Sequence, residues 1–188
     1  MSNEEINQLD IFKEPMAMGE VFQKSGMFPD IKSATQAVVK IMAGKELGLT
    51  PFQSMASIYI VNGRLSLTSQ AMSSLIKKTK KYDYKVIKMD ETECSIDFYS
   101  GDEKQGNSTF TFKDAAKAGL VNKDVWKNYP KNMLFARALS NGARFYAPDA
   151  ICGYYSKEEV EDLGEEILPI KTTVSIDVDG KVNNDSQG

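Results

Sequence analysis

Basic residues recur at helical spacing between positions 130 and 146 of this chain. Lys131 stands near the start of this stretch, and Arg137 and Arg144 follow seven residues apart. At about 100° of rotation per residue, the two arginines fall on the same face of a helix. No carboxylate lies within one turn of either arginine at a spacing suited to an ion pair. Two guanidinium groups on one face, without an acid beside them, are suited to contacting backbone phosphates.

The helix that positions these residues is predicted to begin at Pro130 and to end before Pro148. Proline suits the first helical position, where its missing N–H costs nothing, and no proline lies between these two. The amino end of the helix, near Lys131, also favours an anion through its unpaired N–H groups and its dipole. A solvated helix face is the alternative interpretation of the arginines. The opposite face is predicted to pack in the core and comprises Phe135, Leu139, Gly142 and Tyr146.

Charge is segregated along the sequence. The formal net charge is −3, but residues 21–157 hold 20 bases and 12 acids, so the acids concentrate at the two ends. Within this middle part, residues 64–88 carry seven bases against one acid, and residues 104–144 carry eight against two. Two basic blocks in one small domain are typical of a protein that binds a polyanion. The lysine pair Lys77-Lys78, taken alone, is equally consistent with an ordinary solvated surface.

The apolar and turn residues predict an α+β fold without a repeating strand-helix-strand order. Asn62-Gly63, between two short strand-like runs, is the strongest two-residue signal for a β-hairpin. Further strands are expected at 84–89, 94–99 and 108–112, giving a small antiparallel sheet packed with helices. Besides the long basic helix near the C-terminal end of the core, helices are expected at 15–24, 33–47, 51–57, from 68 onward and at 114–118.

The chain is expected to form one core. Its 188 residues, of which 41% are hydrophobic, suffice for one domain and leave little room for a second. We expect residues 1–25 to form an N-terminal arm or a helix that contacts another subunit, because its apolar side needs a partner. Residues 26–164 are expected to form the core. Residues 165–188 are acidic and poor in apolar side chains, which predicts a disordered tail.

The sequence shows no feature of a membrane or secreted protein. It has no run of about 18 apolar residues and no signal-peptide pattern at its start, so we expect a soluble cytoplasmic protein without a membrane partner. Cys94 and Cys152 form no metal-ligand pattern, and each is expected to be a small buried apolar residue.

Several kinds of chemistry are disfavoured by the residue content. The chain has no histidine, which removes the commonest general base and any His-dependent zinc site. Gly44-Lys45 lacks the upstream glycine and the following Ser or Thr of a phosphate-binding loop. We therefore expect no cofactor, no bound metal and no enzymatic activity. Glu158-Glu159 is compatible with magnesium binding, but an exposed helix start stabilised by negative charge is the simpler interpretation.

The order and spacing of several motifs between positions 45 and 163 are distinctive. They are Gly48-Leu49-Thr50-Pro51, the strand Cys94-Ser95-Ile96-Asp97-Phe98-Tyr99, and Trp126-x-x-x-Pro130-Lys131-x-Met133-Leu134 followed by Ala143-Arg144 and Tyr155-x-x-Glu158-Glu159. Together these motifs resemble the RecT/Redβ superfamily of phage single-strand annealing recombinases.

The resemblance implies a RecT/Redβ-like annealing fold. It also implies a protein that binds single-stranded DNA and pairs complementary strands without ATP, assembled as a ring or helical filament. The DNA-binding basic residues of the family correspond to Lys131, Arg137 and Arg144. The implied partners are single-stranded DNA, the annealed duplex, further copies of the chain, and a phage exonuclease or host single-strand binding protein in the cytoplasm of a bacterial host cell.

In such a protein, basic side chains hold the phosphates while the base edges stay free to find a complementary strand. The predicted DNA contacts therefore also include Arg64, Lys127, Lys77 and Lys78. Tyr59, Tyr129 and Trp126 are candidates for stacking on bases. For Trp126 we favour a role in the core, where it fixes the start of the long helix.

Two other functions are compatible with the sequence. The chain is alternatively a non-enzymatic module that keeps this fold and binds other proteins. A magnesium-dependent nuclease built on Glu158 and Glu159 is the third possibility.

Overall fold

The structure, a computed structural model, describes residues 3–163. The helices are α1 (Asn3–Lys24), α2 (Ala34–Glu46), α3 (Pro51–Ser57), α4 (Ser69–Lys78), α5 (Phe112–Lys117), α6 (Asp124–Asn128), α7 (Pro130–Tyr146), α8 (Pro148–Ile151) and α9 (Lys157–Leu163), with a 3-10 turn at Leu120–Asn122. The strands are β1 (Ile58–Val61), β2 (Arg64–Leu67), β3 (Tyr82–Met89), β4 (Glu93–Ser100) and β5 (Glu103–Thr111). The predicted tail at 165–188 lies outside the described residues.

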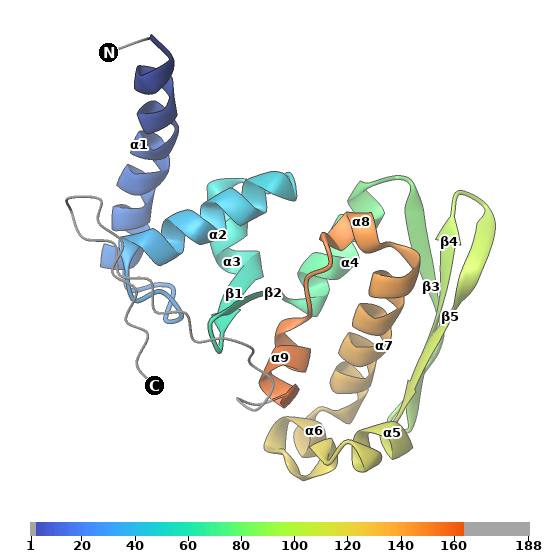
Figure 1. The fold of residues 1–188 in the computed structure, drawn as a ribbon. Coiled ribbons are helices and arrows are strands. Elements are labelled where there is room, and N and C mark those ends of the chain that lie inside the picture. The colour runs from blue at the N-terminus through green and yellow to red at the C-terminus, as the bar shows by residue number, and fades with distance from the viewer. Residues whose placement is uncertain (1–2, 164–188) are drawn as a thin grey trace, which may run out of the picture.

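These elements confirm the predicted α+β class. A hairpin, β1–β2, stands apart from a three-stranded antiparallel sheet in the order β3-β4-β5. Figure 1 shows α7 along one face of this sheet, with α4, α9 and the hairpin on the other side of α7. Helices α5 and α6 lie at one end of the sheet and α8 at the other. The sheet and the helices around α7 therefore form successive layers.

The predicted hairpin and its turn are confirmed. Asn62 and Gly63 have φ values of 50° and 73°, as the two central residues of a type I′ turn require. The turn sets the register, in which Tyr59 pairs with Ser66. Arg64 follows the turn directly and is half-buried.

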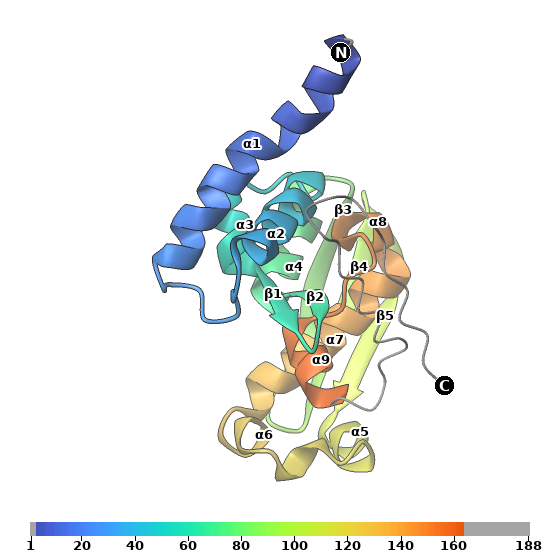
Figure 2. The same cartoon turned by 60° about the vertical axis from the view of Figure 1, so that its left-hand side comes forward.

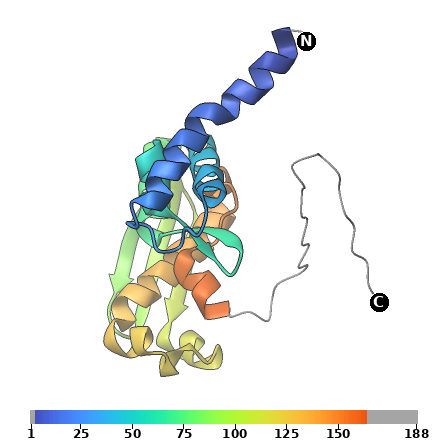
Figure 3. The ribbon, with the colours of Figure 1, turned by 90° about the vertical axis from the view of Figure 1, so that its left-hand side faces the viewer.

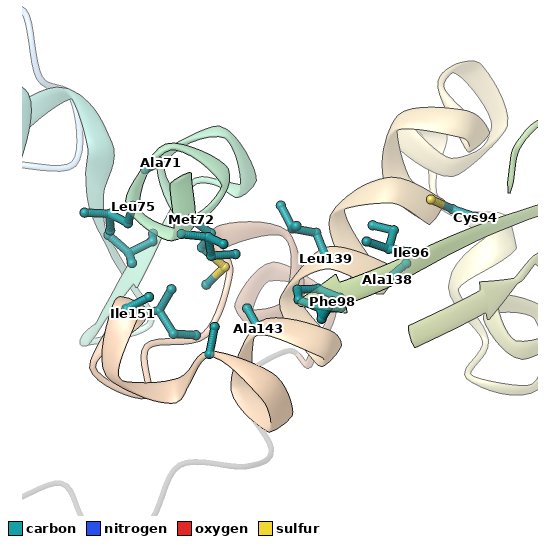
Figure 4. Close-up of a cluster of buried hydrophobic side chains, with 14 of the residues drawn as sticks. Ala71, Met72, Leu75, Cys94, Ile96, Phe98, Ala138, Leu139, Ala143 and Ile151 are labelled. Atoms are coloured by element: carbon teal, nitrogen blue, oxygen red, sulfur yellow. The ribbon is translucent and has the colours of Figure 1, made fainter. Parts of the chain in front are cut away.

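Helix α7 is in close contact with the sheet. A Cβ atom at Gly142 would stand 2.0 Å from Phe98 Cε2 and 2.8 Å from Ser108 Cβ, so only glycine fits there without displacement. Ser108 Oγ donates a hydrogen bond of 2.7 Å to the carbonyl of Ala138. Figure 4 shows the core cluster that surrounds this contact; it includes Met72 and Leu75 from α4, Ile96 and Phe98 from β4, and Ala138, Leu139 and Ala143 from α7. Helix α7 is thus buried on two sides.

Helices α1 to α3 form a separate, smaller layer. The sequence predicted the first helix from Pro15, but α1 begins at Asn3 and contains Pro15, which costs one intrahelical hydrogen bond. Figures 2 and 3 show the amino-terminal half of α1 extending away from the rest of the chain. The other half packs on α2, where a Cβ at Gly19 would be 2.7 Å from the carbonyl oxygen of Ala34. The small core of this layer comprises Ile31, Ala37, Ile41 and Met55.

A buried lysine joins this layer to the hairpin. The side chain of Lys40 is 0% exposed, and its Nζ donates to Asp30 Oδ2 at 2.9 Å and to the carbonyl of Met55 at 3.0 Å. Asp30 Oδ2 also accepts a hydrogen bond of 3.1 Å from the backbone N–H of Ile60 in β1. Burial lowers the pKa of Lys40, while Asp30 opposes that shift. One carboxylate therefore connects α2 with the hairpin.

Replacing Lys40 by methionine should destabilise the fold strongly. The change leaves Asp30 without its cation and the Met55 carbonyl without its donor, and removal of one member of a buried ion pair costs about 3 kcal/mol or more. Urea denaturation of Lys40→Met measures this loss. Lys45→Met, on the exposed side of the same helix, is the control and should cost less than about 1 kcal/mol. Equal losses in the two variants would contradict the role given to Lys40.

Candidate nucleic-acid interface

Four exposed lysines gather where α5, α6 and α7 meet. Lys113 and Lys117 lie on α5, Lys127 on α6 and Lys131 in the first turn of α7. Lys127 Nζ is 4.0 Å from Asp124 Oδ1, a contact at the limit of an ion pair. Within residues 3–163, the other three side chains form no salt bridge or hydrogen bond. We call these four residues the α5–α7 lysine end.

The lysines at 77–81, which are part of the predicted basic block 64–88, lie at the opposite end of the sheet. Because the strands are antiparallel, the residues that precede β3 and those that follow β5 are at different ends. The block 77–81 is therefore separated from Lys113 by the length of β4, about 26 Å for eight residues. Helix α7 has 17 residues and spans about 25 Å, from Lys131 at one end towards Arg144 at the other. Helix α7, itself part of the predicted block 104–144, thus runs between the α5–α7 lysine end and the end of the sheet that holds the lysines at 77–81 (Figure 1).

The predicted contacts Lys77 and Lys78 lie on the surface but already have partners. Lys77 Nζ pairs with Asp83 and stands 4.7 Å from the centroid of the Tyr84 ring. Lys78 Nζ donates to the carbonyl of Gly48. Contacts this exposed contribute at most about 1 kcal/mol to stability, so replacing these partners of the lysines by a phosphate costs little.

The two arginines of α7 share one carboxylate. Arg144 Nη1 is 2.6 Å from Glu159 Oε2, and Arg137 Nη1 is 3.6 Å from Glu159 Oε1. Ser140, between the arginines on α7, donates its hydroxyl to the same carboxylate. The side chains of Arg137, Arg144 and Glu159 are 14%, 24% and 4% exposed. No carboxylate lies within one turn of either arginine, but α9 supplies one from 15 positions beyond Arg144.

Glu159 is also wrongly predicted as part of an exposed helix start. Burial disfavours its ionised form, but the hydrogen bonds from Arg144 and Ser140 outweigh burial and lower its pKa. Glu159 forms a capping box with Ser156, whose N–H donates to Glu159 Oε2 at 3.2 Å while its hydroxyl accepts from the N–H of Glu159 at 3.1 Å. Its neighbour Glu158 accepts a hydrogen bond of 3.1 Å from Ser69 instead.

The two acids therefore point to different partners rather than to a shared ion. Among the residues that the structure describes, no group of three or more histidine, cysteine or acidic side chains is arranged to hold a metal.

The three aromatic candidates occupy different environments. Trp126 is 0% exposed, which confirms its predicted place in the core. Tyr129 is 62% exposed and directly precedes α7, two residues from Lys131. Tyr59 is half-buried on the hairpin, with Lys157 Nζ 4.3 Å from its ring centroid. Tyr129 is thus the candidate with a ring open to solvent.

The two cysteines are both free thiols but differ in exposure. Cys94 is buried as predicted, and burial raises the pKa of its thiol to about 11. Cys152 is exposed, so the prediction of burial is wrong there. Its backbone has a φ of 47° after α8, a turn position at the surface.

Comparisons with known proteins found no match. No family model and no curated protein matches the sequence, and no solved structure matches the fold. The resemblance to the RecT/Redβ superfamily therefore rests on the motifs quoted above. In the part of the chain described by the structure, no helix has both the length and the apolar character needed to cross a membrane.

The contribution of Glu159 to stability should depend on pH. Its pKa is lowered by folding from an ordinary value of 4.5, so the ionised form stabilises the fold above pH 4.5. This stabilisation is lost as the pH falls below 4.5 through the folded-state pKa. We expect Glu159→Gln, which removes the charge but can keep the capping bond, to be roughly 3 kcal/mol less stable than wild type at pH 7.

The difference between the two proteins should shrink at pH 3, as measured by urea denaturation across this range. Glu161→Gln removes an exposed charge from the same helix, where Glu161 is 3.6 Å from Lys157. It should cost less than about 0.5 kcal/mol at either pH. If the stability difference between wild type and Glu159→Gln does not change with pH, the carboxylate does not stabilise the fold through its charge.

Proposed function

We propose that this protein binds single-stranded DNA and anneals complementary strands without ATP, on a RecT/Redβ-like annealing fold and as an oligomer, in phage-type recombination. The observation that carries the proposal is the α5–α7 lysine end. It presents four exposed lysines at one end of the sheet, and three of them form no salt bridge or hydrogen bond within the described residues. We choose single-stranded DNA among the possible polyanions because of the motif resemblance.

The start of α7 combines the features that bind a strand without reading its sequence. No side chain caps the helix; Pro130 has no N–H, and those of Asn132 and Met133 donate to the carbonyl of Tyr129, which leaves the N–H of Lys131 for a phosphate. Lys131 and Lys127 add charge beside it, and Tyr129 offers an exposed ring for stacking. Phosphate contacts with base stacking provide affinity while base edges stay free, which annealing requires.

The size of the basic surface supports action as an oligomer. The distance of about 25 Å along α7 corresponds to about seven nucleotides at a stacked spacing of 3.4 Å. One chain therefore offers only a short binding site. Several copies along one strand are needed to hold enough nucleotides for a stable duplex to form.

A module that binds other proteins is the second candidate. It is favoured by apolar side chains that remain exposed on α2 and α3: Val39 is 44%, Met42 is 38% and Phe52 is 58% exposed. A chain that stays monomeric with and without single-stranded DNA in light scattering would favour this candidate over annealing. A nuclease has less support, because Glu158 and Glu159 bind different partners.

Removing charge from the lysine end should weaken DNA binding. We expect Lys127→Ala combined with Lys131→Ala to reduce the slope of log affinity against log salt by about 1.4, since each lost single-strand phosphate contact removes about 0.7. Annealing of complementary oligonucleotides should slow in parallel. The control is Lys32→Ala with Lys45→Ala, an equal change of charge on exposed residues of another layer. An unchanged slope in the folded double variant at the lysine end would exclude this surface as the interface.

The ring of Tyr129 should contribute to affinity but not to stability. Base stacking on an aromatic side chain contributes roughly 1 to 3 kcal/mol, so Tyr129→Ala should bind a short oligonucleotide about tenfold more weakly or worse. Its melting temperature should stay near that of wild type, because the side chain is largely exposed. Tyr129→Phe keeps the ring and should bind like wild type. Loss of binding in both variants would show that the hydroxyl, not stacking, is responsible.

A further inference from the structure

The contact between α7 and α9 has the composition of an anion-binding site. On α7, Arg137 Nη1, Arg144 Nη1 and the Ser140 hydroxyl converge on one negatively charged group. Asn141 fixes the orientation of this set by accepting a hydrogen bond of 2.8 Å from Arg144 Nη2. The occupant is Glu159 of the same chain. The site is thus complete on α7, and a carboxylate from α9 fills it.

This occupant satisfies the site only in part. Three buried side-chain polar atoms in the described part of the chain have no hydrogen-bond partner: Arg137 Nε, Glu158 Oε2 and Asp162 Oδ2. The first belongs to α7 and the other two to α9. A buried polar group without a partner costs roughly 1 to 3 kcal/mol. Only Arg137 Nε lies at the contact with Glu159, because Glu158 faces Ser69 of α4 and Asp162 faces Lys123 and Trp126.

Helix α9 is held mainly by polar contacts. Of its residues with described side chains, Val160 is the buried apolar one, at 4% exposure. The other attachments are ion pairs and hydrogen bonds, such as Lys123 Nζ to Asp162 Oδ1 at 3.0 Å. The helix follows Cys152 and Gly153, which both have positive φ. Elements with few buried apolar contacts are among those that open locally, and the bound anion must then replace the contacts of Glu159.

We infer that Glu159 occupies the position of a nucleic-acid phosphate, and that α9 leaves the basic face of α7 when a DNA strand binds. This inference rests on the proposed function. A phosphodiester resembles the carboxylate in carrying one negative charge shared by two oxygens, so the exchange preserves the charge of the site. Guanidinium groups bind both kinds of anion through the same paired geometry.

Displacement of α9 would join the two basic blocks. With Glu159 removed from the face of α7, Arg137 and Arg144 place two cations along the line of this helix, about 120° around its axis from Lys131. A strand bound along this line would reach from the α5–α7 lysine end towards residues 77–81. In the free protein, α9 interrupts this line, so the full affinity for DNA appears only after α9 has moved.

The first experiment tests the anion site without DNA. Glu159→Gln removes the charge of the occupant while a glutamine can retain the capping bond to Ser156. We expect sodium sulfate to produce a saturable rise of a few degrees in the melting temperature of this variant relative to sodium chloride of equal ionic strength. Wild type and Glu161→Gln should show only the smaller, non-saturating effect of sulfate on any protein. The same sulfate response in all three proteins would overturn the inference.

The second experiment measures binding of a short single-stranded oligonucleotide. Glu159→Gln should bind about tenfold more tightly than wild type with the same salt slope, because the same phosphates are bound and only the competing carboxylate is gone. Glu161→Gln carries the same net charge and should bind like wild type. Equal affinity gains in both variants would show a general charge effect and overturn the inference.

Hydrogen exchange on the wild-type protein avoids any dependence on how the variants fold. Backbone N–H groups of α9 should exchange faster when the oligonucleotide is bound, while those of α7 should exchange more slowly. Unchanged or slower exchange in α9 would overturn the inference.

The outcomes separate this inference from the proposed function. DNA binding by wild type without any effect of Glu159→Gln leaves the proposed function standing and overturns the inference. A specific sulfate response without DNA binding in any variant confirms the anion site but overturns the proposed function, and with it the assignment of the anion as DNA.

Discussion

The contact between α7 and the three-stranded sheet determines where every basic group of the candidate interface lies. Gly142 allows the helix to approach Phe98 closely, and the bond from Ser108 to the backbone of α7 fixes its position along the strands. The helix then directs both arginines towards Glu159 of α9, and the guanidinium of Arg137 also lies 5.2 Å from the centroid of the Phe110 ring in β5. Lys131 stands at one end of the sheet because α7 begins there. The placement of charge thus follows from apolar packing and from the glycine at position 142.

Much of the fold could be predicted because its signals are local. The Asn62-Gly63 turn, the serine and threonine caps and the proline at the start of α7 each act within four residues, and each element forms where they place it. The core position of Trp126 followed from its place before the helix. Strands β3 and β5 are longer than predicted, because pairing with β4 extends them beyond the apolar residues that marked them.

The candidate site could be predicted less well, because its decisive contact is not local. Spacing along α7 showed two arginines without an acid, and no pattern in the sequence indicates that Glu159 folds back onto them. Lys113 and Lys117 belong to a predicted basic block, but nothing in the sequence singles them out, since their exposure depends on how α5 lies at the end of the sheet. Charge segregation was the useful signal. It located the basic surface but could not show which cations were already paired.

The close approach at Gly142 has a consequence for any motion of this protein. With Phe98 against its backbone, α7 packs closely on the sheet, so we expect the sheet and α7 to move together. Rearrangement is confined to the elements on the far side of α7. The separation between the cationic groups at the two ends is consequently constant, whatever the remaining helices do. A flexible polymer bound to this surface would have to match the spacing of the protein's cationic groups. Each added copy of the protein would impose the same spacing on the polymer.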